Sequence, residues 1–358
     1  MKLLLCTPFL ALLLLAAPAA AQLSLTPPAA TPSPAPEKPK EKSATKPHAV
    51  KKKEAAPAPK PSASPSPPPA ATVIPAPPTD NSNVDLVYGA YQRGQYKTAF
   101  DLATARAQGG DPKAMTMLGQ LYSSALGIKR DYAKAVEWYK RASDAGDREA
   151  MFELAMMRMA GRGGPVDKGD AVKLLASAAK LGAPKAAYNL ALLYLDGQTL
   201  PQDVRRSAEL LRQAADAGLP EAQYALATFY KEGTGVPKDI ERAVRLLQAA
   251  SLADNVDAEV EYAIALFNGT GTPKNMPAAV ALLRKAARQN SPIAQNRLAW
   301  VLINGMGTQA DKIEGFKWHL VAKTGGKGDP ELDKQLTDLP PEDRAKAEAA
   351  AKKWLGTK

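Results

Sequence analysis

A repeat of constant length constrains this chain more than any other feature of its sequence. Starting at Asp111, the chain divides every 36 residues, without an insertion, into six units. The fourth and the thirty-second residues of every unit are alanine, beginning with Ala114 and Ala142. A fixed period of this length is typical of proteins that stack one supersecondary unit after another. The chain is therefore expected to form a linear array and not one closed core.

Each unit has the pattern of two helices. In its first half, apolar or small residues stand at positions 4, 8, 9, 11 and 12, with Arg158 as the exception, and this is the period of a helix with one buried face. The second half of every unit begins at an aspartate or asparagine, as at Asp131, and these residues cap helix N-termini. Glycines such as Gly182 and Gly233 end the helices, because glycine adopts the left-handed conformation of a C-cap. The sequence therefore predicts an all-α fold, a right-handed α-solenoid of antiparallel helix pairs.

The two ends of the array depart from the repeat. Residues 81–110 are predicted to form a degenerate N-terminal capping repeat ahead of the six repeats in 111–326. Residues 327–358 contain Pro340 and Pro341 followed by a charged helical pattern. We expect C-terminal capping helices there, with Trp354 covering the apolar end of the last unit.

Residues ahead of the array have a different composition. Residues 1–21 follow the pattern of a signal peptide, with one lysine, an apolar run, and Ala19 and Ala21 before the expected cleavage site. We predict export to the periplasm of a Gram-negative-type bacterium; an uncleaved inner-membrane anchor is the alternative. Residues 22–80 hold 17 of the 31 prolines, which predicts a disordered linker. Its basic run at 51–53 is either a solvated charge run or a weak contact for an anionic polymer or membrane surface.

The sequence contains little that catalysis or metal binding needs. It has two histidines and one cysteine, Cys6, which lies in the predicted signal peptide. His319 stands where four units have leucine, so we expect a packed core residue and not a general base. No phosphate-binding, nucleophile-elbow or metalloprotease motif occurs. We predict no enzymatic activity, no catalytic residue, no cofactor and no metal site.

Two segments carry the most specific pattern of the repeat. Residues 114–142 and 222–250 follow A-x-x-x-L-[GA]-x-x-Y and then G-x-G-x-x-x-D-x-x-x-A-x-x-[WL]-x-x-x-A, with alanine in place of the first glycine in 114–142. This pattern resembles the Sel1-like repeat family, a relative of the tetratricopeptide repeat. Members are mostly adaptors, and exported bacterial members regulate sensor kinases, exopolysaccharide synthesis or cell-wall enzymes. The resemblance implies a scaffold whose partner is a protein, such as an envelope sensor or a cell-wall enzyme.

Two other functions stay open at this point. One branch of the family, with a disulfide in each repeat, has been linked to β-lactam binding or hydrolysis, but these repeats contain no cysteine. A cell-wall-associated hydrolase or β-lactam-binding enzyme is one alternative, and a structural spacer bound to wall polymer through the basic linker is the other. The formal net charge of +11 is spread along the chain, and no module for reading nucleic acid is visible. We therefore predict no nucleic-acid partner, and we expect a monomer.

The first helices carry the predicted binding residues. By similarity to tetratricopeptide units, the third, sixth, tenth, thirteenth and fourteenth residues of a unit face a concave groove. The predicted partner-binding groove consists of Phe152, Met156, Met159, Tyr188, Leu192, Tyr224, Lys231, Ile264, Phe267, Trp300 and Asn304. Exposed aromatic and methionine side chains are typical of surfaces that bind peptides. The alternative is that neighbouring first helices bury these residues against one another.

Overall fold

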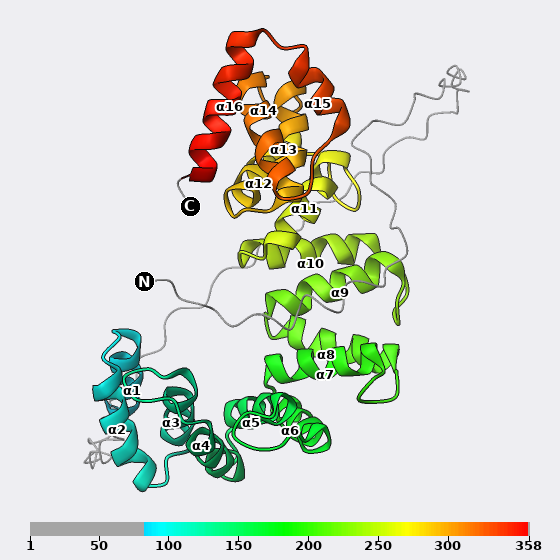
Figure 1. Ribbon diagram of the computed structural model, residues 1–358. Coiled ribbons are helices and arrows are strands. Elements are labelled where there is room, and N and C mark those ends of the chain that lie inside the picture. The colour runs from blue at the N-terminus through cyan, green and yellow to red at the C-terminus, as the bar shows by residue number, and fades with distance from the viewer. Residues whose placement is uncertain (1–81, 357–358) are drawn as a thin grey trace, which may run out of the picture. The chain divides into compact units, whose positions relative to one another are not determined.

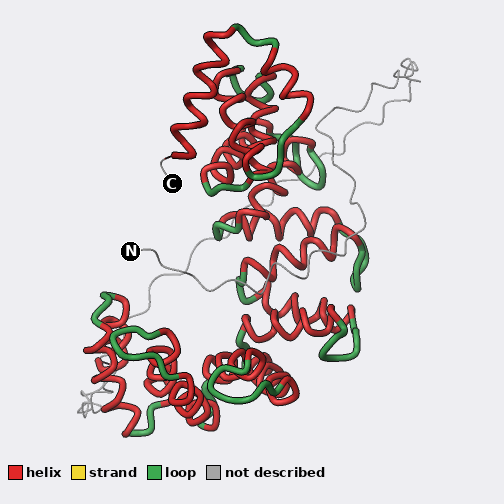
Figure 2. Tube along the Cα trace, in the orientation of Figure 1, coloured by secondary structure: helices red, strands yellow, loops and turns green. Residues whose placement is uncertain are grey.

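A computed structural model of the chain describes residues 82–356. These residues form sixteen α-helices, and no β-strand occurs among them (Figure 1; Figure 2). The predicted signal peptide, 1–21, and the predicted linker, 22–80, lie outside the described residues. Within 82–356, no helix has both the length and the apolar character that crossing a membrane requires.

The helices alternate between the first and the second helix of a pair. The first helices are α1 (Ser82–Gln92), α3 (Pro112–Ser124), α5 (Arg148–Ala160), α7 (Pro184–Asp196), α9 (Pro220–Glu232), α11 (Val256–Asn268) and α13 (Pro292–Asn304). The second helices are α2 (Tyr96–Gln108), α4 (Tyr132–Asp144), α6 (Lys168–Lys180), α8 (Val204–Asp216), α10 (Ile240–Leu252), α12 (Met276–Arg288) and α14 (Lys312–Thr324). From α1 to α14, each helix packs against the next one along the chain. This succession of neighbouring contacts is the architecture of a solenoid.

Side chains at the predicted cap positions begin the second helices. In all six units the oxygen of the cap residue accepts a hydrogen bond, at 2.8–3.1 Å, from the amide three residues later. The cap residues are Asp131, Asp167, Asp203, Asp239, Asn275 and Asp311. Because the first amides of a helix lack a partner within the helix, each cap fixes where its helix begins. The prediction that these residues act as helix caps is confirmed.

The borders between units repeat one backbone hydrogen bond. The first amide of a unit donates to the carbonyl of the thirty-second residue of the unit before it, as Asp147 N does to Ala142 O at 3.0 Å. The same bond recurs after the last unit, where Lys327 N donates to Ala322 O at 2.9 Å. The alanines at the fourth and thirty-second positions are buried in every unit. Only a methyl group fits where neighbouring helices pack this closely, which explains why these positions never vary within the chain.

Two further helices, α15 (Pro330–Thr337) and α16 (Pro341–Gly356), follow the last pair. α16 packs along α14, and Trp354 meets Trp318 edge to face with 5.1 Å between ring centroids. Leu332 of α15 is fully buried. Both helices therefore pack against the last pair of the array and cover part of its apolar surface (Figure 1).

Candidate functional site

The structure places the eleven predicted groove residues at different depths. Met156, Met159, Tyr188, Leu192, Tyr224, Lys231, Ile264 and Trp300 are partly exposed, and Asn304 is exposed. Phe152 and Phe267 are buried, with 9% and 6% of their surface accessible. The two phenylalanines are therefore buried and do not belong to the accessible part of the predicted groove. We call the surface formed by the third, sixth, seventh, tenth, thirteenth and fourteenth residues of units two to six the first-helix face.

The sixth position of a unit shows why these depths differ. Phe152 belongs to a continuous core with residues such as Leu175, whereas Tyr188 and Tyr224 pack against that core and stay partly exposed. A phenol carries a polar tip on an apolar ring, so its ring can rest on the core while the hydroxyl stays near polar groups. The two tyrosines are therefore the aromatic residues at this position that a partner can reach.

Tyr224 connects two successive first helices. Its hydroxyl donates to Glu261 Oε1 at 3.3 Å, and Lys231 Nζ lies 2.8 Å from Glu261 Oε2. Tyr224 and Lys231 lie on α9 and Glu261 lies on α11, so these contacts bridge neighbouring units. Burial raises the pKa of Tyr224, and the carboxylates of Glu261 and Asp257 raise it further. The phenol is therefore held neutral, as a hydrogen-bond donor beside negative charge.

Carboxylates surround the partly exposed apolar side chains. The third, seventh and fourteenth positions of units two to five carry Glu149, Glu153, Asp196, Glu221, Glu232, Asp257 and Glu261. On the whole first-helix face of these four units, the only cationic side chains are Lys185 and Lys231. Burial raises the pKa of Glu153, with an opposing effect of Lys185, and burial together with Glu261 raises the pKa of Asp257. The centre of this face is therefore acidic, although the chain as a whole is basic.

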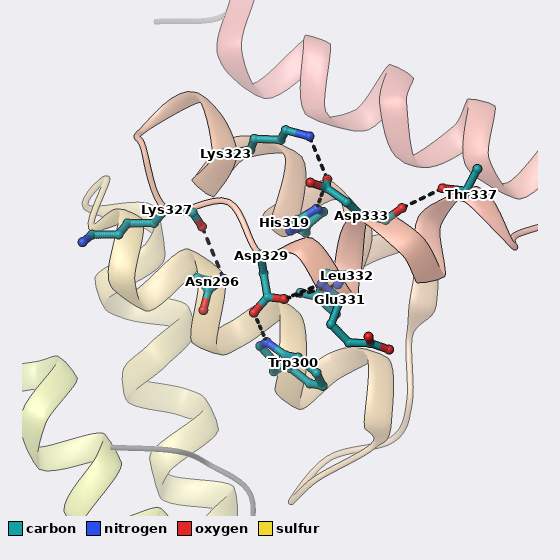
Figure 3. A network of polar contacts seen from close by, with 10 residues as sticks. All are labelled: Asn296, Trp300, His319, Lys323, Lys327, Asp329, Glu331, Leu332, Asp333 and Thr337. Atoms are coloured by element: carbon teal, nitrogen blue, oxygen red, sulfur yellow. Dashed lines mark hydrogen bonds and ion pairs between the residues drawn. The ribbon is translucent and has the colours of Figure 1, made fainter. Parts of the chain in front are cut away.

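At the C-terminal end, polar contacts connect the first-helix face to residues beyond the last repeat (Figure 3). Trp300 Nε1 donates to Asp329 Oδ2 at 2.8 Å, and Asn296 Nδ2 donates to the carbonyl of Lys327 at 3.3 Å. The other carboxylate oxygen of Asp329 accepts from two amides at the start of α15 and caps that helix. Asn304, also predicted for the groove, donates to the carbonyl of Trp300 at 2.8 Å. This end of the predicted groove thus already has partners within the chain.

His319 lies in the core beneath this end. Its side chain is fully buried, and Nε2 lies 2.8 Å from Asp333 Oδ1 on α15. Lys323 Nζ reaches the same oxygen at 2.8 Å, and these two hydrogen bonds hold the pKa of Asp333 below its ordinary value. The sequence predicted His319 as a packed residue, and its burial confirms this. Its surroundings give a substrate no access, so the histidine positions α15 against α14.

The chemistry available on the first-helix face is recognition by charge, hydrogen bonds and apolar contact. Among residues 82–356, no group of three or more His, Cys, Asp or Glu side chains is arranged to hold a metal ion. Sequence reasoning missed the contacts of Glu261 and Asp329, because they join residues from different units. It also overlooked the acidic residues at the third and seventh positions, although their recurrence from Glu149 to Glu261 was visible in the sequence.

Comparison with known families explains the repeat. A model of the family described as Sel1 repeat matches residues 112–147, 148–182, 184–219, 220–255, 256–291 and 292–326, together more than half of the chain. The chain belongs to the Sel1 repeat family. The predicted resemblance and the predicted all-α solenoid are both confirmed.

Solved structures of Sel1 repeat proteins have the same fold. A Sel1 repeat protein from Oxalobacter formigenes is 26% identical, with a TM-score of 0.61, over 68% of this chain and 99% of that one. The protein c5321, a protective antigen of uropathogenic Escherichia coli strains, is 22% identical, with a TM-score of 0.50, over 77% of this chain and 68% of its own. No curated protein matches the chain. These likenesses establish the fold, while the partner has to be argued from the residues of this chain.

Proposed function

We propose that this protein is a scaffold that binds a partner protein through its first-helix face. One observation carries the proposal: partly exposed apolar and aromatic side chains recur on successive first helices, at the same positions of the repeat. Met156, Tyr188, Leu192, Tyr224 and Ile264 follow one another on α5, α7, α9 and α11. A row of such side chains on rigid helices matches the anchors with which grooves bind peptides. The scaffold role common in the family supports the same function.

The proposal extends to where the protein acts. We propose that the signal-peptide pattern in residues 1–21 directs export to the periplasm, where a monomer presents its first-helix face to an envelope sensor or a cell-wall enzyme. Fractionation of cells that produce the chain with and without residues 2–21 checks the location. Cytoplasmic protein in both cases would contradict it.

A charge placed in the centre of the face tests the binding role. Leu192 is partly exposed on α7, so Leu192→Asp puts a carboxylate on the apolar row without opening a core cavity. We expect crosslinking in cells to recover one dominant partner with the wild-type chain and to lose it with this variant. The control is Leu252→Asp, because Leu252 lies on a second helix and is 79% exposed.

The outcome is read together with the fold of both variants. Circular dichroism and thermal unfolding establish that each keeps its helices. If the folded Leu192→Asp variant recovers the partner as well as the wild type does, the first-helix face is not the binding surface. If Leu252→Asp loses the partner equally, binding involves the second helices instead.

A further inference from the structure

We infer that the segment bound by the first-helix face is a cationic peptide, extended and rich in arginine or lysine. This inference rests on the proposed function and specifies the chemistry of the partner. It follows from the contrast between the acidic centre of this face and the net charge of +11 of the whole chain. The first-helix face thus differs in charge from the rest of this basic chain. A local excess of negative charge favours ligands of positive charge.

Most of these carboxylates form no ion pair within the described residues, although Lys185 lies close enough to lower the pKa of Glu153. Glu261 pairs with Lys231 at 2.8 Å. In the part of the chain that the structure describes, no ion pair involves Glu149, Glu153, Glu221, Glu232 or Asp257. The exposed side chains among them, Glu149, Glu221, Glu232 and Asp257, can therefore interact with a ligand.

The tyrosines add a second recognition element for a cation. Glu221 lies close enough to Tyr188, and Asp257 to Tyr224, to raise the pKa of each phenol beyond the effect of burial. A guanidinium or ammonium group over a partly exposed tyrosine ring gains a cation–π interaction in addition to its pairing with a carboxylate. Arginine suits such a place best, because its planar group stacks on the ring and binds the carboxylate with two hydrogen bonds.

The repeat predicts the spacing of the cations. Tyr188 and Tyr224 take the sixth position of successive units, and neighbouring helices in a stack are separated by one helix diameter, about 10–12 Å. An extended peptide advances about 3.3 Å per residue, so about three of its residues span one unit. A small cation would neutralise one carboxylate only. In a peptide with a cation at every third residue, successive cations would pair with carboxylates of successive units.

The experiment measures peptide binding by fluorescence anisotropy with the full chain. The probe is a fluorescein-labelled peptide of five Arg-Pro-Ala triplets, and its counterpart has Glu in place of Arg. The test variant is Glu221→Gln with Asp257→Gln, two exposed side chains on α9 and α11. The control variant is Glu137→Gln with Glu241→Gln, two exposed carboxylates on the second helices α4 and α10. Both variants change the net charge equally, so only the place of the lost charge differs.

The wild type and the control should bind the arginine peptide within twofold of each other. The test variant should bind it about fivefold to tenfold more weakly, as the loss of two partly solvated ion pairs implies. Binding should weaken as salt rises. The inference fails if both variants lose affinity equally, or if the wild type binds the glutamate peptide as tightly as the arginine peptide.

The crosslinked partner separates this inference from the proposed function. If Leu192→Asp abolishes the recovery of the partner and Glu221→Gln with Asp257→Gln leaves it unchanged, the face binds a protein without the proposed cations. The inference is then wrong, and the proposed function stands. If Leu192→Asp leaves recovery unchanged, the proposed function fails, whatever the peptide assay shows.

Discussion

The middle of the first-helix face and its C-terminal end use the same repeat positions and differ in what contacts them. In unit three, Leu192 takes the tenth position and is partly exposed. In unit six, Trp300 takes the tenth position and donates to Asp329, which lies beyond the last repeat. The tenth position is thus partly exposed in both regions, and at the C-terminal end a polar residue from beyond the last repeat already contacts it.

One carboxylate from each region shows an opposite effect of its surroundings. Burial raises the pKa of Glu153 in the middle, whereas Lys323 and His319 lower the pKa of Asp333 at the end. The charged form of Glu153 therefore opposes folding, whereas the charged form of Asp333 supports it. A charged side chain that lowers the stability of the fold is typical of a surface that is kept for binding.

The largest expected effect comes from truncating the two residues at the tenth position. Trp300→Ala removes a large ring and its hydrogen bond to Asp329, so we expect a loss of about 2–3 kcal/mol in the stability of the C-terminal end. Leu192→Ala is the matched change in the middle and should cost about 1 kcal/mol, because a partly exposed side chain buries less surface. Hydrogen exchange of α15 and thermal unfolding measure both. Equal losses in the two variants would mean that α15 does not depend on Trp300.

A smaller effect is expected from Asp333→Asn. At pH 7 this change should destabilise the docking of α15 by about 1 kcal/mol, since the side chain is 38% exposed and its pairing with Lys323 is partly screened by solvent. The folded pKa is depressed, so the contribution exists above the unfolded value of about 4 and disappears as pH falls through the folded pKa. Hydrogen exchange of α15 at pH 7 and pH 3 should show the difference from wild type shrinking in acid. A constant difference would contradict the role of the charge.

The smallest expected effect is opposite in sign. Glu153→Gln should stabilise the chain at pH 7 by about 0.5 kcal/mol, because it removes a carboxylate whose charged form is disfavoured by burial. The folded pKa is raised, so wild-type stability is fully present below about pH 4 and is lost as pH rises through the folded pKa. Thermal unfolding at pH 4 and pH 7 should show a gain at pH 7 only, with the exposed Glu137→Gln as control. A loss at pH 7 would show that Glu153 makes a stabilising contact.

Much of the fold follows from the sequence, because its causes are local or exactly periodic. The cap at Asp131 acts on an amide three residues away, and its effect is readable in any unit. The buried alanines at the fourth and thirty-second positions follow from a close helix contact that is the same at each border. A contact that recurs in every unit therefore appears in the sequence as a constant residue.

The candidate site was less predictable, because it depends on contacts that vary between units. Phe152 and Tyr188 share the sixth position, yet the phenylalanine is buried and the tyrosine partly exposed. Helical position gives the direction of a side chain, while its depth depends on its own polarity and on the neighbours of the next unit. The contacts from Tyr224 to Glu261 and from Trp300 to Asp329 join residues 37 and 29 positions apart, and no pattern within one unit encodes them.

The hydrogen bond shared by all unit borders gives each junction the same backbone connection. Asn255 N donates to Ala250 O, and Ser291 N donates to Ala286 O, in the same register that Lys327 N keeps with Ala322 O. A duplicate of residues 255–290 inserted after Asn290 would meet a compatible junction on both sides. Such a duplication would lengthen the first-helix face by one unit and leave both termini of the array as they are. The length of the first-helix face is thus a matter of copy number, which can change without a new fold.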